Sequence, residues 1–346
     1  MRKEFEINNE YVKAGESKII RLTLPELHSE STITMPVHVI HGKKEGPVLF
    51  ISAAVHGDEI NGVEIIRRIL SLGTISRLKG TLLAVPVVNI FGFNSHSRYL
   101  PDRRDLNRSF PGGESGSLAG RIANIFMKEV VCRSAIGIDL HTAAIDRDNF
   151  PQIRADLKNE KLSVVAKKFE SPVILHSAPP TGSLRLAAAQ KGVPVMVYES
   201  GEALRFDERS IRVAVRGILN VMTELGMLAK PKPKKAKAPL LLRSSTWMRA
   251  PISGILRAVV SLGDMVEKGD IVGYISEPAG KTDTIVEASS KGIIIGRTNI
   301  PLVYEGEALF HIGRTQQTTF QEEDVDDIYN EDSLNTPELV EEPVIV

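Results

Sequence analysis

Short apolar runs alternate with amphipathic segments along the first two thirds of the chain. Nearly continuous runs of apolar, often β-branched residues are typical of strands buried on both faces. Five such runs cover residues 47–55, 81–88, 134–140, 171–176 and 193–199. Apolar residues three and four positions apart predict amphipathic helices over 59–72, 117–132, 160–169, 183–191 and 207–225. This alternation predicts an α/β fold with a central, mostly parallel or mixed sheet and helices on both of its faces.

The pattern changes near both ends of this region. Residues 1–44 contain two further apolar runs, which we expect to add strands to the sheet. Residues 230–239, KPKPKKAKAP, hold five lysines and three prolines, a composition typical of a stiff, solvated linker. Residues 246–313 are rich in glycine and β-branched residues and lack a helical pattern, which predicts a small all-β unit. From Gln321 onward the tail carries ten acidic and no basic residues, which predicts disorder. We therefore expect an α/β domain at 1–229, a linker at 230–243, a β-rich domain at 244–314 and a disordered acidic tail at 315–346.

Composition narrows the class of protein. The 346 residues include 43 basic and 43 acidic side chains, so a generally basic surface for nucleic acid is excluded. Cys132 is the single cysteine, which excludes a disulfide scaffold and a cysteine-based zinc finger. The sequence shows neither a signal peptide nor an apolar stretch of membrane-spanning length. We expect a cytoplasmic protein with no membrane and no nucleic-acid partner.

Metal-ligating residue types follow two of the predicted strands. His56 and Glu59 stand three positions apart in VHGDEINGVE (55–64), where a strand ends and a helix begins. His141 ends another strand in IDLHTA (138–143). Ligands bind beyond the carboxyl ends of strands in such sheets, and two histidines with one carboxylate are a ligand set of catalytic zinc. The alternative is an ordinary surface histidine beside a glutamate in the first turn of a helix.

Two acidic residues near strand ends have two interpretations each. Asp139 lies two positions before His141, on the same face of a strand, so its carboxylate can bond the far nitrogen of a ligating imidazole. A buried aspartate bonded to backbone amides is the alternative. Glu199 ends the strand in VPVMVYESG (193–201), where a carboxylate beside a metal-activated water can act as general base. Glu199 can instead cap a helix or pair with an arginine.

A loop at 97–113, SRYLPDRRDLNRSFPGG, packs four arginines among proline, glycine and aspartate residues. Long loops inside compact domains are usually functional. An arginine fork binds a carboxylate through two parallel hydrogen bonds, and Asn107 beside Arg108 can add an amide donor. Arg98 can stabilise the oxyanion of a carbonyl under attack. A phosphate-binding loop or a solvated charged surface fits the same composition.

Four motifs in order, HGDE, DLNRSFPG, DLHT and YESG, resemble the succinylglutamate desuccinylase/aspartoacylase family, which is related to the zinc carboxypeptidases. The resemblance covers roughly residues 45–225. It implies a zinc-carboxypeptidase-like mixed sheet and one Zn²⁺ per chain held by His56, Glu59 and His141.

The same resemblance assigns the substrate contacts. It implies that Asn107 and Arg108 bind a substrate carboxylate and that Glu199 is the general base and acid. Arg98 is the arginine expected to polarise the scissile carbonyl, with Arg103 and Arg104 as alternatives.

The resemblance implies a zinc-dependent amidohydrolase that cleaves an N-acyl amino acid with a free carboxylate, by means of a zinc-activated water. An alternative is a metallocarboxypeptidase that removes C-terminal residues such as glutamate from a peptide or protein. A non-catalytic binding or scaffold protein is the alternative of another class. A homo-oligomer is a possible assembly.

The β-rich domain resembles the biotinyl and lipoyl carrier domains, chiefly in VSLGDMVEKGDIVGYI (260–275). Lys281 lies near the place of the carrier lysine, but the methionines that flank a biotinylated lysine are absent, so we interpret it as a turn lysine. Trp247, the single tryptophan, is expected to anchor the core of this domain. In the succinylglutamate desuccinylase/aspartoacylase family that the first domain resembles, a C-terminal β-domain can form one wall of the active site.

Overall fold

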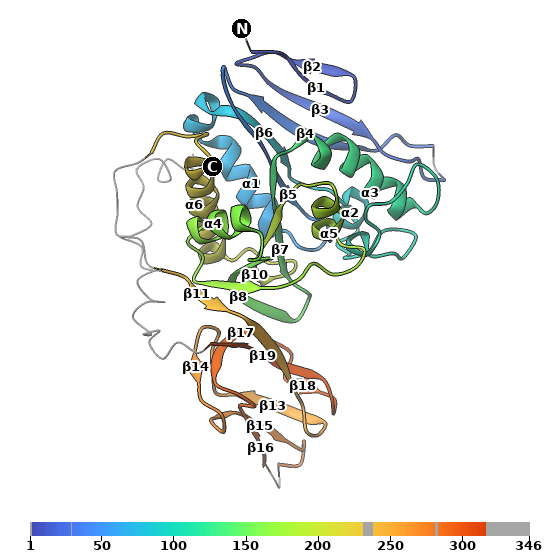
Figure 1. Cartoon of the computed structure of the whole chain (residues 1–346). Helices are drawn as coiled ribbons and strands as arrows, with labels where there is room; N and C mark the ends of the chain where they lie inside the picture. The colour runs from blue at the N-terminus through green and yellow to red at the C-terminus, as the bar shows by residue number, and fades with distance from the viewer. Residues whose placement is uncertain (1, 29, 231–237, 281–282, 316–346) are drawn as a thin grey trace, which may run out of the picture.

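The computed structural model describes residues 2–28, 30–230, 238–280 and 283–315. Most of the lysine- and proline-rich linker, Lys281 and the acidic tail from residue 316 lie outside the described residues. The chain forms one large mixed sheet flanked by helices, together with two smaller antiparallel sheets (Figure 1). The predicted α/β fold with an additional all-β part is confirmed.

Four parallel strands form the centre of the large sheet, in the order β6, β5, β7, β10. They are β5 (Lys44–Ala53), β6 (Lys79–Val85), β7 (Ile136–Ala143) and β10 (Val195–Glu202). Every residue of β7 is buried, as expected of a strand covered on both faces. Beyond β6 the sheet continues with two antiparallel strands, β4 (Thr34–His41) and β3 (Ser17–Thr23). A separate hairpin near the N-terminus pairs β1 (Phe5–Ile7) with β2 (Glu10–Val12).

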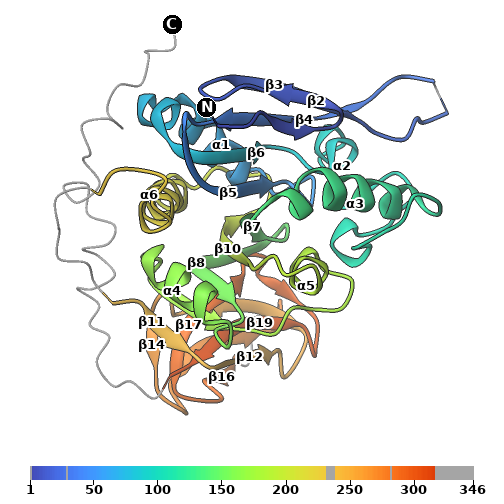
Figure 2. The ribbon, with the colours of Figure 1, turned by 45° about the horizontal axis from the view of Figure 1, so that its top comes forward.

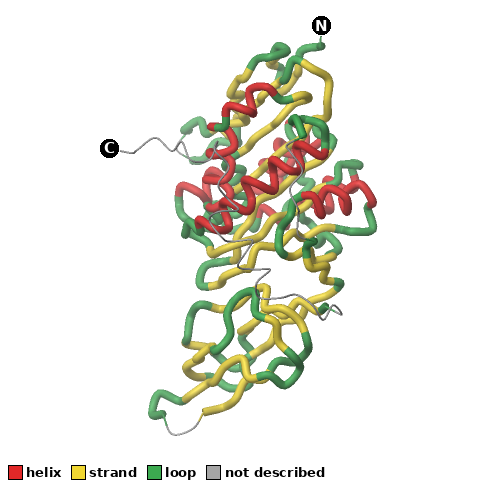
Figure 3. The backbone as a smooth tube through the Cα atoms, turned by 90° about the vertical axis from the view of Figure 1, so that its left-hand side faces the viewer, coloured by secondary structure: helices red, strands yellow, loops and turns green. Residues whose placement is uncertain are grey.

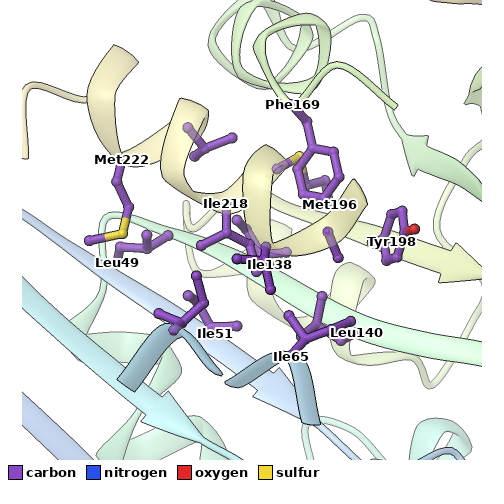
Figure 4. Packing of buried hydrophobic residues seen from close by; sticks show 14 of the residues in the cluster. Leu49, Ile51, Ile65, Ile138, Leu140, Phe169, Met196, Tyr198, Ile218 and Met222 are labelled. Carbon is purple, nitrogen blue, oxygen red and sulfur yellow. The ribbon is translucent and has the colours of Figure 1, made fainter. Parts of the chain in front are cut away.

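Helices cover both faces of this sheet (Figure 2). One face carries α1 (Asn61–Ser71), α4 (Glu160–Lys168) and α6 (Glu208–Glu224). The other carries α2 (Ile90–Asn94), α3 (Leu118–Glu129) and α5 (Leu184–Gln190). Ile51 and Ile138 of the sheet belong to the same buried cluster as Ile65 of α1 and Ile218 of α6 (Figure 4). Within the described residues, no helix is long and apolar enough to cross a membrane.

Polar side chains determine where most of these helices begin. The side-chain oxygen of the capping residue accepts a hydrogen bond from a backbone N–H of the first turn, which has no partner inside the helix. The capping residues are Asn89, Ser117, Asn159, Ser183 and Asp207, before α2, α3, α4, α5 and α6 respectively. Three short 3₁₀ turns complete the helical elements: η1 (Gly73–Arg77), η2 (Leu106–Arg108) and η3 (Val131–Arg133).

One strand of the large sheet, β8 (Arg147–Ala155), was not predicted from the apolar pattern. Its sequence RDNFPQIRA mixes charged and amide side chains with a proline, so it lacks a continuous apolar run. One edge of β8 pairs with β10. The other edge is shared by β9 (Val173–His176) and β17 (Gly292–Thr298). Because β17 belongs to the C-terminal region, β8 carries the large sheet from the α/β part into that region.

The C-terminal β-rich part, residues 240–315, contains strands and no helix among the described residues (Figure 3). The short strand β11 (Leu240–Leu242) pairs with β9. The large sheet then continues through β17, β19 (Ala308–Arg314) and β12 (Ser244–Arg249), and β14 (Met265–Val266) pairs with β17. A four-stranded antiparallel sheet contains β16 (Asp283–Glu287), β15 (Ile271–Ser276), β13 (Gly254–Ala258) and β18 (Leu302–Val303). Residues from both sheets form one buried apolar cluster around Phe310 and Ile275.

Asp148, opposite Arg297 where β8 pairs with β17, makes the stability of this junction pH-dependent. Burial, together with the nearby carboxylate of Asp207, raises the pKa of Asp148 to about 6, although Arg297 opposes the shift. An acid with a raised pKa binds its proton more tightly when folded, so the free energy of unfolding falls as pH rises from about 4 to 6.

We therefore expect Asp148→Asn to raise the free energy of unfolding at about pH 7.5, measured by denaturant titration. The gain should shrink at about pH 4.5, where the wild-type carboxyl is largely protonated in the folded chain. An equal gain at both pH values would contradict the assignment.

Candidate active site

The three residues with zinc-ligand chemistry lie together at the carboxyl ends of β5 and β7. His56 Nδ1 is 2.7 Å from one Glu59 carboxylate oxygen, and His141 Nδ1 is 2.6 Å from the other. One ligand atom from each of the three residues lies within 4.8 Å of the others, and all three residues are buried. This compact set of two imidazoles and one carboxylate is a possible metal site.

The turn that presents His56 and Glu59 depends on a close backbone approach. The turn follows β5, and the amide of Glu59 donates to the carbonyl of His56. A Cβ on Gly57 would lie 2.0 Å from the carbonyl carbon of Gly92, so only glycine fits between this turn and α2. Glu59 precedes α1, which begins at Asn61, so the predicted placement of Glu59 inside the helix was wrong by two residues.

Each imidazole contacts an aspartate through Nε2, the ring nitrogen that does not face Glu59. His141 Nε2 lies 2.8 Å from Asp139, whose other oxygen accepts a hydrogen bond from Ser52. His56 Nε2 lies 3.2 Å from Asp105. Such contacts fix ring orientation, and they leave both Nδ1 atoms turned toward Glu59. The sequence indicated this use of Asp139, whereas Asp105 appeared only as the first letter of a motif.

The electrostatics of this cluster favour a bound cation. Burial opposes charge on His141, but Asp139 and Glu59 raise its pKa well above the ordinary value, and the pKa of His56 is raised by Glu59 and Asp105 despite its burial. Burial also works against an ionised Glu59, yet the two imidazoles lower the pKa of Glu59 far below its usual range. A buried carboxylate flanked by protonated imidazoles can exchange their protons for a metal ion, so the donor set fits zinc.

Arg98 is the arginine of the 97–113 loop that reaches this cluster. Its guanidinium lies 3.3 Å from Glu59 and 3.0 Å from Asp105. Asn89, the cap of α2, donates its side-chain amide to the carbonyl of Arg98 and so ties this backbone down. The two alternatives, Arg103 and Arg104, are exposed and do not line the cavity at the cluster.

Asn107 and Arg108 lie in the 3₁₀ turn η2 at the rim of the same cavity. The Asn107 side-chain oxygen accepts a hydrogen bond of 2.9 Å from the amide of Leu184, the first residue of α5. The side-chain nitrogen of Asn107 therefore remains available to a ligand. Arg108 is exposed, and it donates to the carbonyl of Asn107 over 2.7 Å.

Glu199 on β10 lies beside His141 in the register of β10 and β7 and lines the same cavity. Its Oε2 atom forms an ion pair with Arg154 at 2.8 Å and accepts a hydrogen bond from the Asn149 side chain at 3.2 Å. Both donors lie on β8, the strand that the apolar pattern did not predict. The arginine pairing considered for Glu199 is therefore present, inside the cavity.

The cavity around these residues has a volume of about 370 Å³. Besides Arg98 and Arg108, its lining includes three arginines for which the sequence gave no signal: Arg147, Arg154 and Arg185. Trp247 of β12 also lines it, half-buried, so the expectation that it anchors the core of the β-rich domain was wrong. Its indole ring stacks on His311 at 4.4 Å, and the Arg147 guanidinium lies 5.3 Å from the ring centre.

Comparison with known proteins agrees with the motifs. The model of the succinylglutamate desuccinylase/aspartoacylase catalytic domain matches residues 45–225, and the chain belongs to this family. It is similar to the N-alpha-acetyl-L-2,4-diaminobutyric acid deacetylase of Halomonas elongata, with 25% identity over 292 residues, 80% of this chain and 85% of the relative.

Solved structures share the fold over most of their length. The product-bound ectoine utilization protein EutE (DoeB) from Ruegeria pomeroyi has a TM-score of 0.77 at 23% identity, covering 88% of this chain and 98% of that one. A succinylglutamate desuccinylase/aspartoacylase from Rhodobacter sphaeroides has a TM-score of 0.75 at 22% identity, covering 86% and 96%. This coverage includes the C-terminal β-rich part as well as the catalytic region.

Removal of one ligand tests the metal site. We expect His56→Ala and His141→Ala each to lose most of the zinc that the wild-type chain retains after loading and dialysis, because each variant lacks one of three donors. Elemental analysis of the dialysed protein measures the loss. His96→Asn, which changes an exposed histidine outside the cavity, is the matched control and should keep its zinc. Stoichiometric zinc in His56→Ala would overturn the ligand assignment.

Proposed function

We propose that this member of the family is a zinc-dependent deacylase that hydrolyses the amide bond of N-acyl amino acids. The observation that carries the proposal is the presence of His56, Glu59, His141 and Glu199 in one cavity. The name of the Halomonas relative, a deacetylase of an N-acetyl amino acid, supports the same reaction class.

His56 Nδ1, Glu59 and His141 Nδ1 would hold the zinc ion. Zinc bound there would supply Lewis-acid activation of water and of the scissile carbonyl. Asp105 and Asp139 keep the two imidazoles oriented for this task through their Nε2 atoms. Arg98, beside Glu59, donates hydrogen bonds to the carbonyl oxygen as negative charge develops on it.

Glu199 moves the proton. It accepts the proton that the attacking water loses and then returns it to the nitrogen of the leaving amino acid. Its Oε2 is bonded to Arg154 and Asn149, so Oε1 is the oxygen that we assign to proton transfer. The side chain is 19% exposed, which leaves the carboxylate accessible from the cavity.

The substrate carboxylate is assigned to Asn107 and Arg108. The Asn107 side-chain nitrogen and the exposed Arg108 guanidinium are both at the cavity rim, and an amide donor beside a guanidinium suits a carboxylate. These contacts would place the α-carboxylate of the amino acid near the scissile bond.

The shape of the cavity favours a small molecule over a peptide tail. Its volume of about 370 Å³ is at the lower end of the range for small-molecule sites. Trp247 from the C-terminal β-rich part and the segment at Ala178 and Pro180 are among its walls. The small volume supports the deacylase over the metallocarboxypeptidase, and the complete set of candidate catalytic residues supports an enzyme over a scaffold.

A substrate panel tests the proposal. The zinc-loaded chain is incubated with N-acetyl and N-succinyl amino acids and with short glutamate-terminated peptides, and newly freed amines are detected. We expect release from one or more N-acyl amino acids. Glu199→Gln should lower kcat by about a hundredfold or more, because a general base contributes on this scale.

Two results would contradict this assignment. Release of amines from the peptides alone would identify a carboxypeptidase instead. A Glu199→Gln variant that keeps zinc and most of the wild-type rate would remove Glu199 from the reaction. The variant Glu202→Gln is the matched control, because Glu202 lies three residues further on β10 and does not line the cavity.

A further inference from the structure

Glu199 is held by two donors from β8, and one of them also touches the C-terminal β-rich part. Arg154 is an ion-pair partner that itself lines the cavity. Asn149 also lines the cavity, but only 7% of its surface is exposed, and its side-chain nitrogen donates to Glu199 Oε2 over 3.2 Å. Because the ion pair and the hydrogen bond are both made to Oε2, they restrict the rotation of the carboxylate and leave Oε1 outside both contacts.

Asn149 occupies a place where three strands meet. In the sheet register it lies opposite Gly201 of β10 on one edge of β8 and opposite Gly296 of β17 on the other. β17 belongs to the C-terminal β-rich part. Asn149 therefore contacts that part through Gly296 and contacts Glu199 through its own side chain.

Gly296 leaves room for the Asn149 side chain. A Cβ added at Gly296 would lie 2.8 Å from Asn149 Oδ1 and 3.3 Å from Cβ of His311. The first distance is shorter than real Cβ contacts, so a side chain here must displace the Asn149 amide. Glycine is therefore needed at position 296 because any side chain there would occupy the space of the Asn149 amide.

We propose that Asn149 is a positioning residue for Glu199, and that Gly296 of β17 leaves the space that the Asn149 side chain occupies. In this way the C-terminal β-rich part supports the proton-transfer step. This proposal rests on the proposed function of Glu199 as general base. The β-rich part then has two effects on the site: Trp247 forms part of the wall, and Gly296 fixes the geometry of the base through Asn149.

Kinetics on the best N-acyl amino acid of the panel test this inference. We expect Asn149→Ala to lower kcat about ten- to hundredfold, because a small misplacement of a catalytic group has an effect of this size. KM should change less than about twofold, because the side-chain nitrogen of Asn149, which lines the cavity, is used by Glu199 and is not assigned to the substrate. Asn149→Asp keeps the shape but lacks the N–H donor, so it should lose at least as much kcat.

The double variant separates positioning from general damage to the strand. Gly296→Ala should lower kcat at unchanged KM while Asn149 is present. In Asn149→Ala/Gly296→Ala the amide that the new methyl group displaces is gone, so kcat should equal that of Asn149→Ala alone. Additive losses would show that Gly296→Ala acts by distorting β17, and would overturn the link.

Asn299→Ala is the matched control. Asn299 donates its side-chain amide to Glu202 over 3.0 Å, which is the same kind of asparagine–glutamate bond at the same junction but outside the cavity. It should keep wild-type kcat. Zinc content and the thermal midpoint are measured for every variant, so that loss of metal or of folding is recognised.

The outcomes distinguish the inference from the function on which it rests. If Glu199→Gln keeps its rate, the general-base assignment fails and the inference fails with it. A different pair of results would contradict only the positioning role. In that case Glu199→Gln is folded but inactive, whereas zinc-loaded Asn149→Asp and Gly296→Ala keep wild-type kcat. The proposed function then stands, and the positioning role is wrong.

Discussion

The buried Glu59 carboxylate between two imidazoles is the interaction on which the site depends. A charge with so little access to water is tolerated only when it is paired and hydrogen-bonded, and His56 and His141 supply both contacts. The other nitrogens of these two imidazoles contact two more carboxylates, those of Asp105 and Asp139. Three carboxylates are balanced by Arg98 and two imidazolium ions, or equally by Arg98 and one divalent cation with neutral imidazoles. Exchange of two protons for one metal ion therefore preserves the charge of the cluster.

The parallel strands impose the geometry that this cluster needs. β5, β7 and β10 are neighbours with the same direction, so their carboxyl ends meet at one edge of the sheet. His141 and Glu199 lie at those ends, and the turn with His56 and Glu59 follows the end of β5. β8 runs antiparallel to β10, and its Arg154 and Asn149 reach Glu199 in the same cavity. A strand that carries polar residues toward the cavity and pairs with β17 also joins the two parts of the chain.

The sequence predicted the elements that repeat a pattern and missed those that depend on tertiary contact. The buried parallel strands and the α-helices other than α2 follow from apolar spacing, and the family follows from four ordered motifs. β8 was missed because its side chains serve the cavity and the junction, which breaks the strand pattern. Trp247 and Asp105 carry no local signal, because their roles arise from residues far away in sequence, His311 and His56.

The stack of Arg147, Trp247 and His311 contains an imidazole that stays neutral near physiological pH. Burial, with Arg154 nearby, lowers the pKa of His311 to about 3, so the imidazole is neutral near physiological pH. A neutral ring stacks on the indole at 4.4 Å without repelling the guanidinium groups of Arg147 and Arg154. A protonated His311 would add a third cation to this group. Its neutrality therefore favours the contact between Trp247 and Arg147 at the cavity wall.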